Sequence, residues 1–536
     1  MSSTKQKTRP SKPNPRRTRP KPAALPRLRF LGEPMLEFAM GQRLAYPRDG
    51  LFLYGPVGDH ADLPAIRYGV IGTKAGVARF RRWSASIRTM IDIPAPGLRS
   101  REVEPQHVPF PGFEQAFHAA WPVDPVSIID DIDSAEIDRV LKLANRHEAV
   151  RGAVDLYVER LVAAADRIEH PPAFWFVVIP EIVYALGRPQ SSVPKSERIP
   201  GVISISEGRA RQLQREPTLY GDEEEEAEVY RYATHFRRQL KARLLAKRIV
   251  TQIVRETTLT PDEFRRESGM PMRRVEDPAT IAWKLCTGAY YKAGGKPWQL
   301  AEVRPGVCYV GLVYKRSELT ADERHACCAA QMFLTDGEGV VFRGALGPWF
   351  HTDTRQFHLD TTAAANLVTM VIGEYQRLHD RPPSELFIHA PSSFTDEEWQ
   401  GFESACSSET NLVGVQIADA KDSVKLYRPG GYPVIRGTAL QTSDYHAFLW
   451  TSGYAPRLDT YMGPETPNPI SVRVARGRCT LETVLRDVMG LTKINFNSCL
   501  HNDRLPVTIR FANAVGDVLI SAPMDGEPKL PFKFYI

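Results

Sequence analysis

The sequence predicts an α/β protein in which two units with parallel β-sheets follow one another along the chain. Phe174–Ile179 is a continuous apolar stretch between two helical patterns, which is typical of a parallel strand covered on both faces. From residue 307, three apolar strands are followed by alternating helices and strands. A chain of 536 residues, 43 % of them hydrophobic and 25 % charged, is long enough for several domains with buried cores.

Positive charge is concentrated at the start of the sequence. Residues 1–27 carry nine lysines and arginines and no acid, and without them the net charge of +6 becomes −3. We predict a disordered basic tail over 1–27, which acts either as a loose phosphate-binding arm or as a solvated extension. Because the rest of the chain is not basic overall, any nucleic-acid site on it has to be a local channel.

The first α/β unit is predicted over residues 134–298, after a lead-in segment over 28–133. Residues 188–230 are predicted to be loop-like. The acidic run 222–226 within them is predicted to be a solvated loop, with a partner-docking patch as the alternative. The expected elements are helices at 149–167, 232–247 and 280–292 and strands at 174–179 and 251–254.

The second unit is predicted over residues 299–536, with strands at 307–314, 325–334, 339–345, 385–389 and 412–417 and a helix at 363–379. A further helix begins after Thr395, which stands at capping-box spacing from Glu398. Three antiparallel strands followed by alternating helices and strands is the order of an RNase H-like fold. Active enzymes of that fold hold a metal ion with an aspartate at the end of the first strand, where this chain has Val313. A valine side chain cannot bind Mg²⁺.

The best candidate for a binding site is a set of cations in the first unit. Arg237 and Lys241 are four residues apart on one predicted helix, Gln252 follows on the next strand, and Lys292 lies near the end of a later helix. Two or three cations and an amide can together hold a terminal phosphate. A basic, solvated surface helix is the alternative interpretation of the same residues.

Neither a membrane segment nor a metal-binding cysteine pattern is apparent. No apolar run approaches the roughly 18 residues that a membrane-spanning helix needs. The seven cysteines contain no Cys-x-x-Cys pair and most lie in apolar stretches. They are therefore predicted to be reduced core residues of a cytoplasmic protein.

Several short segments, taken in order and spacing, resemble the short prokaryotic Argonautes, which consist of MID and PIWI domains. The matching segments are 33–38, 50–56, 236–243, 251–259, 291–298, 343–344, 491–497, 506–509, 511–512 and 515–516. The resemblance covers about residues 30–536. It implies a Rossmann-like MID domain over 134–298 followed by an RNase H-like PIWI domain over 299–536.

The resemblance assigns roles to the cation set. The MID domain of the family grips the 5′ phosphate of a guide strand, and Lys241, Gln252 and Lys292 match its pocket residues. Arg237 stands where many relatives have tyrosine, and His235 could take its place. The chain end, Ile536, matches a carboxylate that lies near this pocket in the family, sometimes through a metal ion. A Mg²⁺ ion at the guide 5′ phosphate is therefore an expectation of the resemblance.

The PIWI domain is expected to have lost its catalytic ligands. By the resemblance, the three degenerate positions are Val313, Ala390 and Asn497, with Asn495 as the alternative for the last. Asp336 and Glu338 remain in a turn, but a carboxylate there cannot assemble a two-metal site by itself. No catalytic metal and no enzymatic activity of this chain are expected.

Family members that have lost these catalytic ligands act as guide-directed sensors, which is what the resemblance implies for this chain. The expected partners are a guide RNA, a target single-stranded DNA from an invader, and a separate effector protein with an APAZ region. That effector is a TIR or sirtuin-like NADase, or a nuclease. Two alternatives remain open from the residues: an active RNase H-type guided nuclease, and a non-catalytic scaffold that binds proteins.

Overall fold

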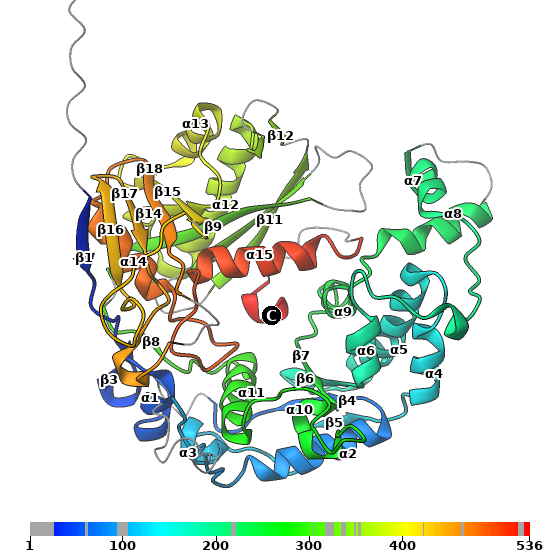
Figure 1. Ribbon diagram of the computed structural model, residues 1–536. Coiled ribbons are helices and arrows are strands. Elements are labelled where there is room, and N and C mark those ends of the chain that lie inside the picture. Colours follow the sequence, from blue (N-terminus) through cyan, green and yellow to red (C-terminus); the bar gives the residue numbers. More distant parts are fainter. Residues whose placement is uncertain are drawn as a thin grey trace, which may run out of the picture.

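Figure 1 shows the computed structural model of the protein, an α/β molecule with two large sheets. The structure describes residues 26–58, 63–93, 106–215, 221–302, 304–316, 326–333, 339–347, 350–351, 355–421, 423–461, 466–523 and 530–536. Most of the predicted basic tail lies outside these ranges.

The first sheet is parallel and is covered by helices on both faces. Its strand order is β5 (Ser127–Ile129), β4 (Tyr68–Ile71), β6 (Phe174–Ile179) and β7 (Thr251–Arg255). All six residues of β6 are buried, and they alternate between two cores because successive side chains point to opposite faces. One core holds α2 (Lys74–Ser86) and α11 (Pro278–Ala293), and the other α4 (Ser134–Leu141), α5 (Arg146–Arg167) and α9 (Phe236–Leu244). The predicted parallel strand with two covered faces is confirmed.

Two expectations for the first unit are wrong. The boundary at 133/134 cuts the first sheet, because β4 and β5 precede it and pair with the rest of the sheet. The segment 188–230 is not one loop, since it contains α7 (Glu207–Arg215) and α8 (Gly221–Glu228). The acidic run falls within α8, where the aliphatic stems of glutamate favour a helix. The short helices α6 (Glu181–Leu186) and α10 (Glu256–Leu259) each follow directly after a strand of the sheet.

The second sheet has nine strands in the described chain. Their order is β1 (Arg27–Phe30), β16 (Thr438–Ser443), β17 (His446–Leu449), β18 (Ile470–Arg476), β15 (Asn411–Asp419), β14 (Glu385–Ala390), β9 (Val307–Arg316), β10 (Ala326–Phe333) and β11 (Gly339–Gly347). Strands β9, β14 and β15 are parallel and the others pair antiparallel. The RNase H-like order predicted from residue 307 is confirmed.

Helices cover this sheet on both sides. On one face, α12 (Thr361–His379) and α13 (Asp396–Ala405) share a core with alternate residues of β9. On the other face lie α14 (Leu481–Leu491) and α15 (Val507–Leu519). Gly311 of β9 lets α15 come close, because a Cβ there would collide with the carbonyl oxygen of Thr508. The predicted cap of α13 is confirmed, since the Thr395 side chain accepts from the Glu398 amide at 3.2 Å.

The two units meet through α15. Asp517 on α15 accepts from Arg238 of α9 at 2.7 Å and pairs with Lys315 of β9 at 3.0 Å. One carboxylate therefore joins the helix of the first unit, the helix of the second and a strand of the second sheet. In Figure 1 α15 (red) lies at the centre of the molecule, between the second sheet and α9.

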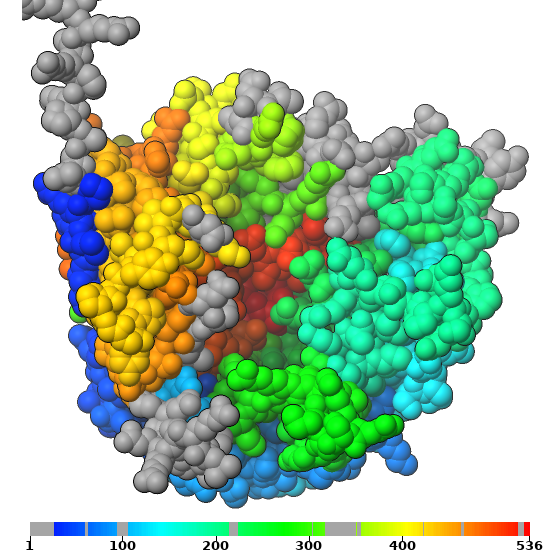
Figure 2. Space-filling model, viewed as in Figure 1, coloured from blue at the N-terminus to red at the C-terminus, as the bar shows by residue number. Residues whose placement is uncertain are grey.

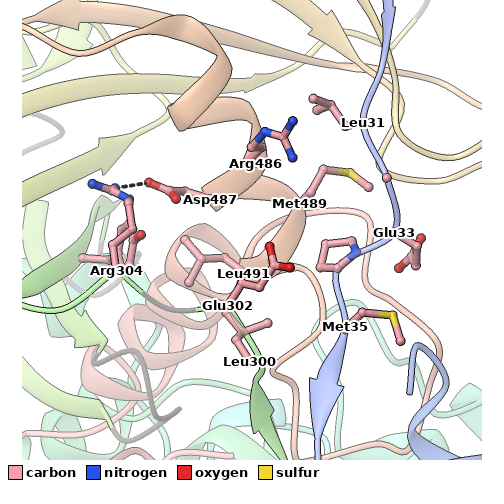
Figure 3. A pocket seen from close by; sticks show the side chains of 14 residues that line it. Leu31, Glu33, Met35, Leu300, Glu302, Arg304, Arg486, Asp487, Met489 and Leu491 are labelled. Carbon is pink, nitrogen blue, oxygen red and sulfur yellow. Dashed lines mark hydrogen bonds and ion pairs between the residues drawn. The ribbon is translucent and has the colours of Figure 1, made fainter. Parts of the chain in front are cut away.

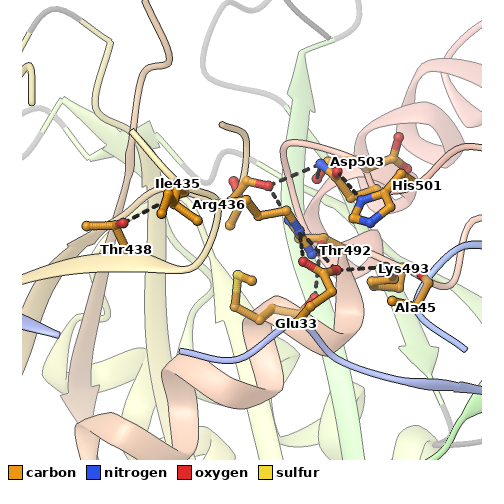
Figure 4. Close-up of polar contacts among 12 residues, drawn as sticks. Glu33, Ala45, Ile435, Arg436, Thr438, Thr492, Lys493, His501 and Asp503 are labelled. Carbon is orange, nitrogen blue, oxygen red and sulfur yellow. Dashed lines mark hydrogen bonds and ion pairs between the residues drawn. The ribbon is translucent and has the colours of Figure 1, made fainter. Parts of the chain in front are cut away.

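The lead-in segment is held to the second sheet by a buried ionic cluster (Figure 4). The Glu33 carboxylate lies 2.8 Å from Nε of Arg436 and 2.7 Å from Nζ of Lys493. Burial by itself would raise the pKa of Glu33, but the two cations hold it well below its ordinary value. The same segment contains β2 (Leu36–Glu37), which joins β3 (Arg43–Leu44) and β8 (Gln299–Leu300) in a small sheet, and α1 (Pro47–Leu53).

Candidate nucleic-acid interface

Three elements of the first unit carry the predicted phosphate-binding residues. Helix α9 carries Lys241, strand β7 carries Gln252, and the last turn of α11 carries Lys292. Helix α11 is sharply defined: the Asp277 side chain accepts from the Thr280 amide at 2.9 Å, and Gly294 ends the helix in the left-handed conformation. These ends fix where Lys292 lies.

Both lysines are buried and use main-chain or neutral partners. Lys241 is 2 % exposed and its ammonium donates to the carbonyl and hydroxyl oxygens of Thr251 at 3.0 and 3.2 Å. It also donates to the main-chain oxygen of Ile536. Lys292 is 1 % exposed and donates to the side-chain oxygen of Gln252. Lys241 contacts the chain end and Lys292 contacts Gln252, and the neighbouring residues Thr251 and Gln252 of β7 link the two contacts. We call Lys241, Gln252, Lys292 and the chain end the lysine pocket.

The surroundings of the lysine pocket disfavour the charged form of both lysines. Burial, followed by repulsion between Lys241 and Lys292 and from Arg237, lowers the pKa of Lys241 well below its ordinary value. Burial and Arg237 lower the pKa of Lys292 in the same way. In the part of the chain that the structure describes, neither ammonium pairs with a carboxylate side chain. Because burying such charge is costly, an anion bound here would be strongly stabilised.

The two remaining predicted residues flank the pocket at the start of α9. Arg237 is exposed and adds positive potential to both lysines. His235 is the residue that precedes the helix, and its Nδ1 is buried without a hydrogen-bond partner. Burial and the neighbouring Arg238 and Arg237 lower the pKa of His235 to about 4. At neutral pH His235 can offer a hydrogen bond to a ligand but not a charge.

Asn497 lies beside Gln252 of the lysine pocket. Its Oδ1 and the side-chain oxygen of Gln252 both face Gly288 of α11, where a Cβ would lie 3.7 and 3.5 Å from them. The Asn497 Oδ1 is buried without a partner. The loop that carries Asn497 thus reaches the first unit before the chain returns to the second sheet as α15, and the assignment of Asn497 as a degenerate catalytic position stays a prediction.

The structure does not bring Val313 and Ala390 to one face of the sheet. Val313 lies in the core beneath α15, whereas Ala390 lies in the core beneath α12 and α13. His389, paired with Gly311 in register, is the β14 residue that faces α15, and its Nδ1 lies 3.0 Å from the Thr508 hydroxyl. Sequence reasoning missed His389 and Thr508, although Thr508 falls in one of the matching segments.

No described group of three or more His, Cys, Asp or Glu side chains could hold a metal ion. Asp336 and Glu338 lie outside the described residues. A cavity of about 230 Å³ lies elsewhere, between the lead-in segment and α14 (Figure 3). There Arg304 pairs with Asp487 at 2.6 Å, and none of the predicted site residues lines the cavity.

Buried histidines should make the fold sensitive to acid. Burial lowers the pKa of His389, which is fully buried, to about 3. Because the unfolded side chain titrates near 6.5, the unfolded state binds more protons between these values, and stability is lost as pH falls through that window. At pH 5 the loss from one such histidine is on the order of 2 kcal/mol.

Urea denaturation of the wild type and of His389→Gln at pH 7.5 and pH 5 checks this expectation. The variant should lose less stability between the two pH values than the wild type. An equal loss in both proteins would show that His389 does not carry the effect.

Figure 2 shows one face of the molecule. This face is hollowed at its centre, with α15 (red) in the floor, the segment around α11 (green) below and the segment around α9 (teal) at the right. None of the described helices is long and apolar enough to cross a membrane.

Solved structures of Argonautes have a similar arrangement. Clostridium butyricum Argonaute bound to a guide DNA and a 19-mer target DNA aligns with a TM-score of 0.56 and 14 % identity, over 95 % of this chain and 55 % of that one. The fold is that of the Argonaute MID and PIWI domains. A. aeolicus Argonaute with externally bound siRNA gives a TM-score of 0.55 at 14 % identity, over 96 % and 56 % of the two chains.

A second structure of A. aeolicus Argonaute gives a TM-score of 0.53 at 12 % identity, over 94 % and 55 % of the two chains. The present chain therefore spans about half the length of these Argonautes. No protein-family model matches the sequence. No curated protein matches it either.

Proposed function

We propose that this chain is a short Argonaute that binds a guide RNA and is inactive as a nuclease. The lysine pocket carries the proposal, because among the described residues neither of its two buried ammonium groups pairs with an acidic side chain, and a bound anion would stabilise their charge. A 5′ phosphate supplies two negative charges and several acceptor oxygens in a compact group. The Argonaute-like fold supports a nucleic acid as the molecule that carries this phosphate.

Each residue of the pocket has a distinct part in holding the phosphate. Lys241 and Lys292 supply charge-assisted hydrogen bonds, and Gln252 orients Lys292. Arg237 and His235 lie at the solvent side, where a strand would enter. The oxygen of Asn497 and the main-chain oxygen of Ile536 are donors of the kind Mg²⁺ prefers, so they would hold an ion at the phosphate, which would neutralise further charge.

We infer the lack of nuclease activity from the residues at the ends of the central strands β9 and β14. Val313 is 1 % exposed in an apolar core, and the His389 Nδ1 lies 3.0 Å from the hydroxyl of Thr508 in the first turn of α15. These groups do not supply the carboxylates of a two-metal site. We therefore expect no cleavage of a guide-paired DNA by the purified chain in Mg²⁺ or Mn²⁺. Cleavage that disappears in a His389→Ala variant would support the active-nuclease alternative instead.

The proposed output is a change in a partner protein. We propose that in the cytoplasm guide and complementary single-stranded DNA together activate an APAZ-containing effector with NADase or nuclease activity. Sequence would be read by base pairing, while the protein contacts mainly the backbone.

The nucleic acid that copurifies with the chain and its neighbouring gene product tests this function. Short RNA that accepts a 5′ label only after phosphatase treatment would support guide binding. The absence of short nucleic acid would favour the scaffold alternative.

A further inference from the structure

An exposed aromatic cluster stands on the loop between β15 and β16 and on the segment after β17. The rings of Tyr432 and Tyr454 stack at 4.4 Å with an angle of 30°. The guanidinium of Arg428 lies 5.0 Å from the centre of the Tyr454 ring. Tyr432 is 44 % exposed, and Tyr427 in the same loop is 79 % exposed. We call Tyr427, Arg428, Tyr432 and Tyr454 the tyrosine platform.

The platform is fixed by its own hydrogen bonds. The Tyr454 amide donates to the Val434 carbonyl at 2.9 Å, and the Tyr454 hydroxyl donates to Asp459 at 2.8 Å. Arg428 Nε donates to the main-chain oxygen of Tyr432 at 3.1 Å. The ring pair is therefore held in place while Tyr432 remains 44 % exposed to solvent. Such a ring face, ordered in advance, favours stacking with a planar partner at a small entropic cost.

A chain of contacts links the platform to the lysine pocket. The loop that carries Asn497 continues to His501, whose ring lies 5.8 Å from that of Tyr46. Arg457, three residues after Tyr454, holds its guanidinium 5.5 Å from the same Tyr46 ring. In Figure 2 the gold segment that contains the platform lies to the left of the hollow, across from α9. These contacts connect the segment that carries the platform to the loop that carries Asn497.

We propose that the tyrosine platform binds unpaired bases of the nucleic acid whose end the lysine pocket holds. Every base has a flat face that can stack on tyrosine, and Arg428 adds a cation close to the backbone. Asp459 accepts from the Tyr454 hydroxyl, and a hydrogen bond to Asp459 together with its charge also raises the pKa of Tyr432, so one carboxylate holds both rings of the pair. This inference rests on the proposed function and adds a second contact to it, for bases where the pocket takes phosphate.

Binding of a 5′-phosphorylated RNA, alone or paired to a DNA with an unpaired extension, tests the platform. Each strand is compared with one whose unpaired nucleotides are abasic. Tyr432→Ala with Tyr427→Ala should weaken binding about tenfold in the arm whose unpaired bases reach the platform, and should leave the abasic strand unchanged. If the variant weakens binding of the RNA alone, the bases come from the guide. If it weakens binding of the paired RNA with the DNA extension, they come from the target. Tyr432→Phe, which keeps the ring, should bind like the wild type.

Tyr445→Ala is the matched control, because Tyr445 is 62 % exposed on the turn between β16 and β17 and is not part of the platform. If the platform variant behaves like Tyr445→Ala in both arms, or weakens base and abasic strands equally, the inference is wrong. A platform that contacts a protein would give the first of these results. The affinity difference between 5′-phosphate and 5′-hydroxyl strands reports on the lysine pocket alone, so failure of the platform and failure of the pocket are distinguishable.

Discussion

Replacing Lys241 and Lys292 together with methionine should abolish the preference for 5′-phosphorylated strands. Each buried lysine can give the phosphate a charge-assisted hydrogen bond, for which about 1.5–3 kcal/mol is typical. Loss of both should weaken binding of 5′-phosphorylated RNA by about a hundredfold or more. Binding of the 5′-hydroxyl strand should change little, because backbone contacts elsewhere supply that affinity. Methionine keeps the volume of the lysine stem, so the buried pocket remains filled.

The control removes two lysines from the neighbourhood of the same helices without touching the pocket. Lys247 follows α9 and pairs with Asp166, and Lys284 lies on α11 and pairs with Glu276. Lys247→Met with Lys284→Met changes the net charge equally, and it should weaken both strands alike. A pocket variant that retains the phosphate preference would exclude this site and favour the scaffold alternative.

The same experiment has a pH dependence that follows from the pocket. Since burial and mutual repulsion lower the pKa of Lys241 and Lys292 in the free protein, phosphate binding restores their protons. Affinity for the 5′-phosphorylated strand should therefore fall as pH rises through the lowered lysine pKa values. The 5′-hydroxyl strand should not show this decrease.

The second large effect is expected at Glu33, which lies between two buried cations. Arg436 is 2 % and Lys493 1 % exposed, and removing Glu33 leaves both without their acidic partner. Glu33→Ala should lower the free energy of unfolding by about 3 kcal/mol, because it leaves the buried charges of Arg436 and Lys493 without a carboxylate partner. Urea denaturation of the wild type and the variant, followed by circular dichroism, measures this change in the free energy of unfolding.

Two further variants separate lost charge compensation from lost packing. Glu37→Ala, in the same segment, removes one hydrogen bond from Gln299 at 3.2 Å and should cost at most about 1 kcal/mol. Glu33→Ala with Lys493→Met should recover part of the lost stability, because the double variant no longer buries the unpaired ammonium of Lys493. If Glu33→Ala is no more destabilising than Glu37→Ala, the cluster does not anchor the lead-in segment.

The parts of the site that could be predicted are those encoded by local pattern. Lys241, Gln252 and Lys292 stand out because a basic helix, a strand and a helix end follow one another at family spacing. The buried strand β6 and the order of strands from β9 could be predicted for the same reason, since apolar periodicity reports burial directly. Asn497 could not be placed, because a loop between distant elements carries no periodic signal about where it packs.

The fold class follows from the sequence, because helices, strands and their burial are encoded in residue periodicity, and the family resemblance added Lys241, Gln252 and Lys292 as pocket residues. Which residues share an environment became apparent in the tertiary structure. It joined β4 and β5 to the first sheet, brought Asn497 beside the pocket, and placed Val313 and Ala390 on opposite faces of the second sheet. These are contacts between residues far apart in the chain, and they depend on register and packing, which a strand pattern leaves undetermined.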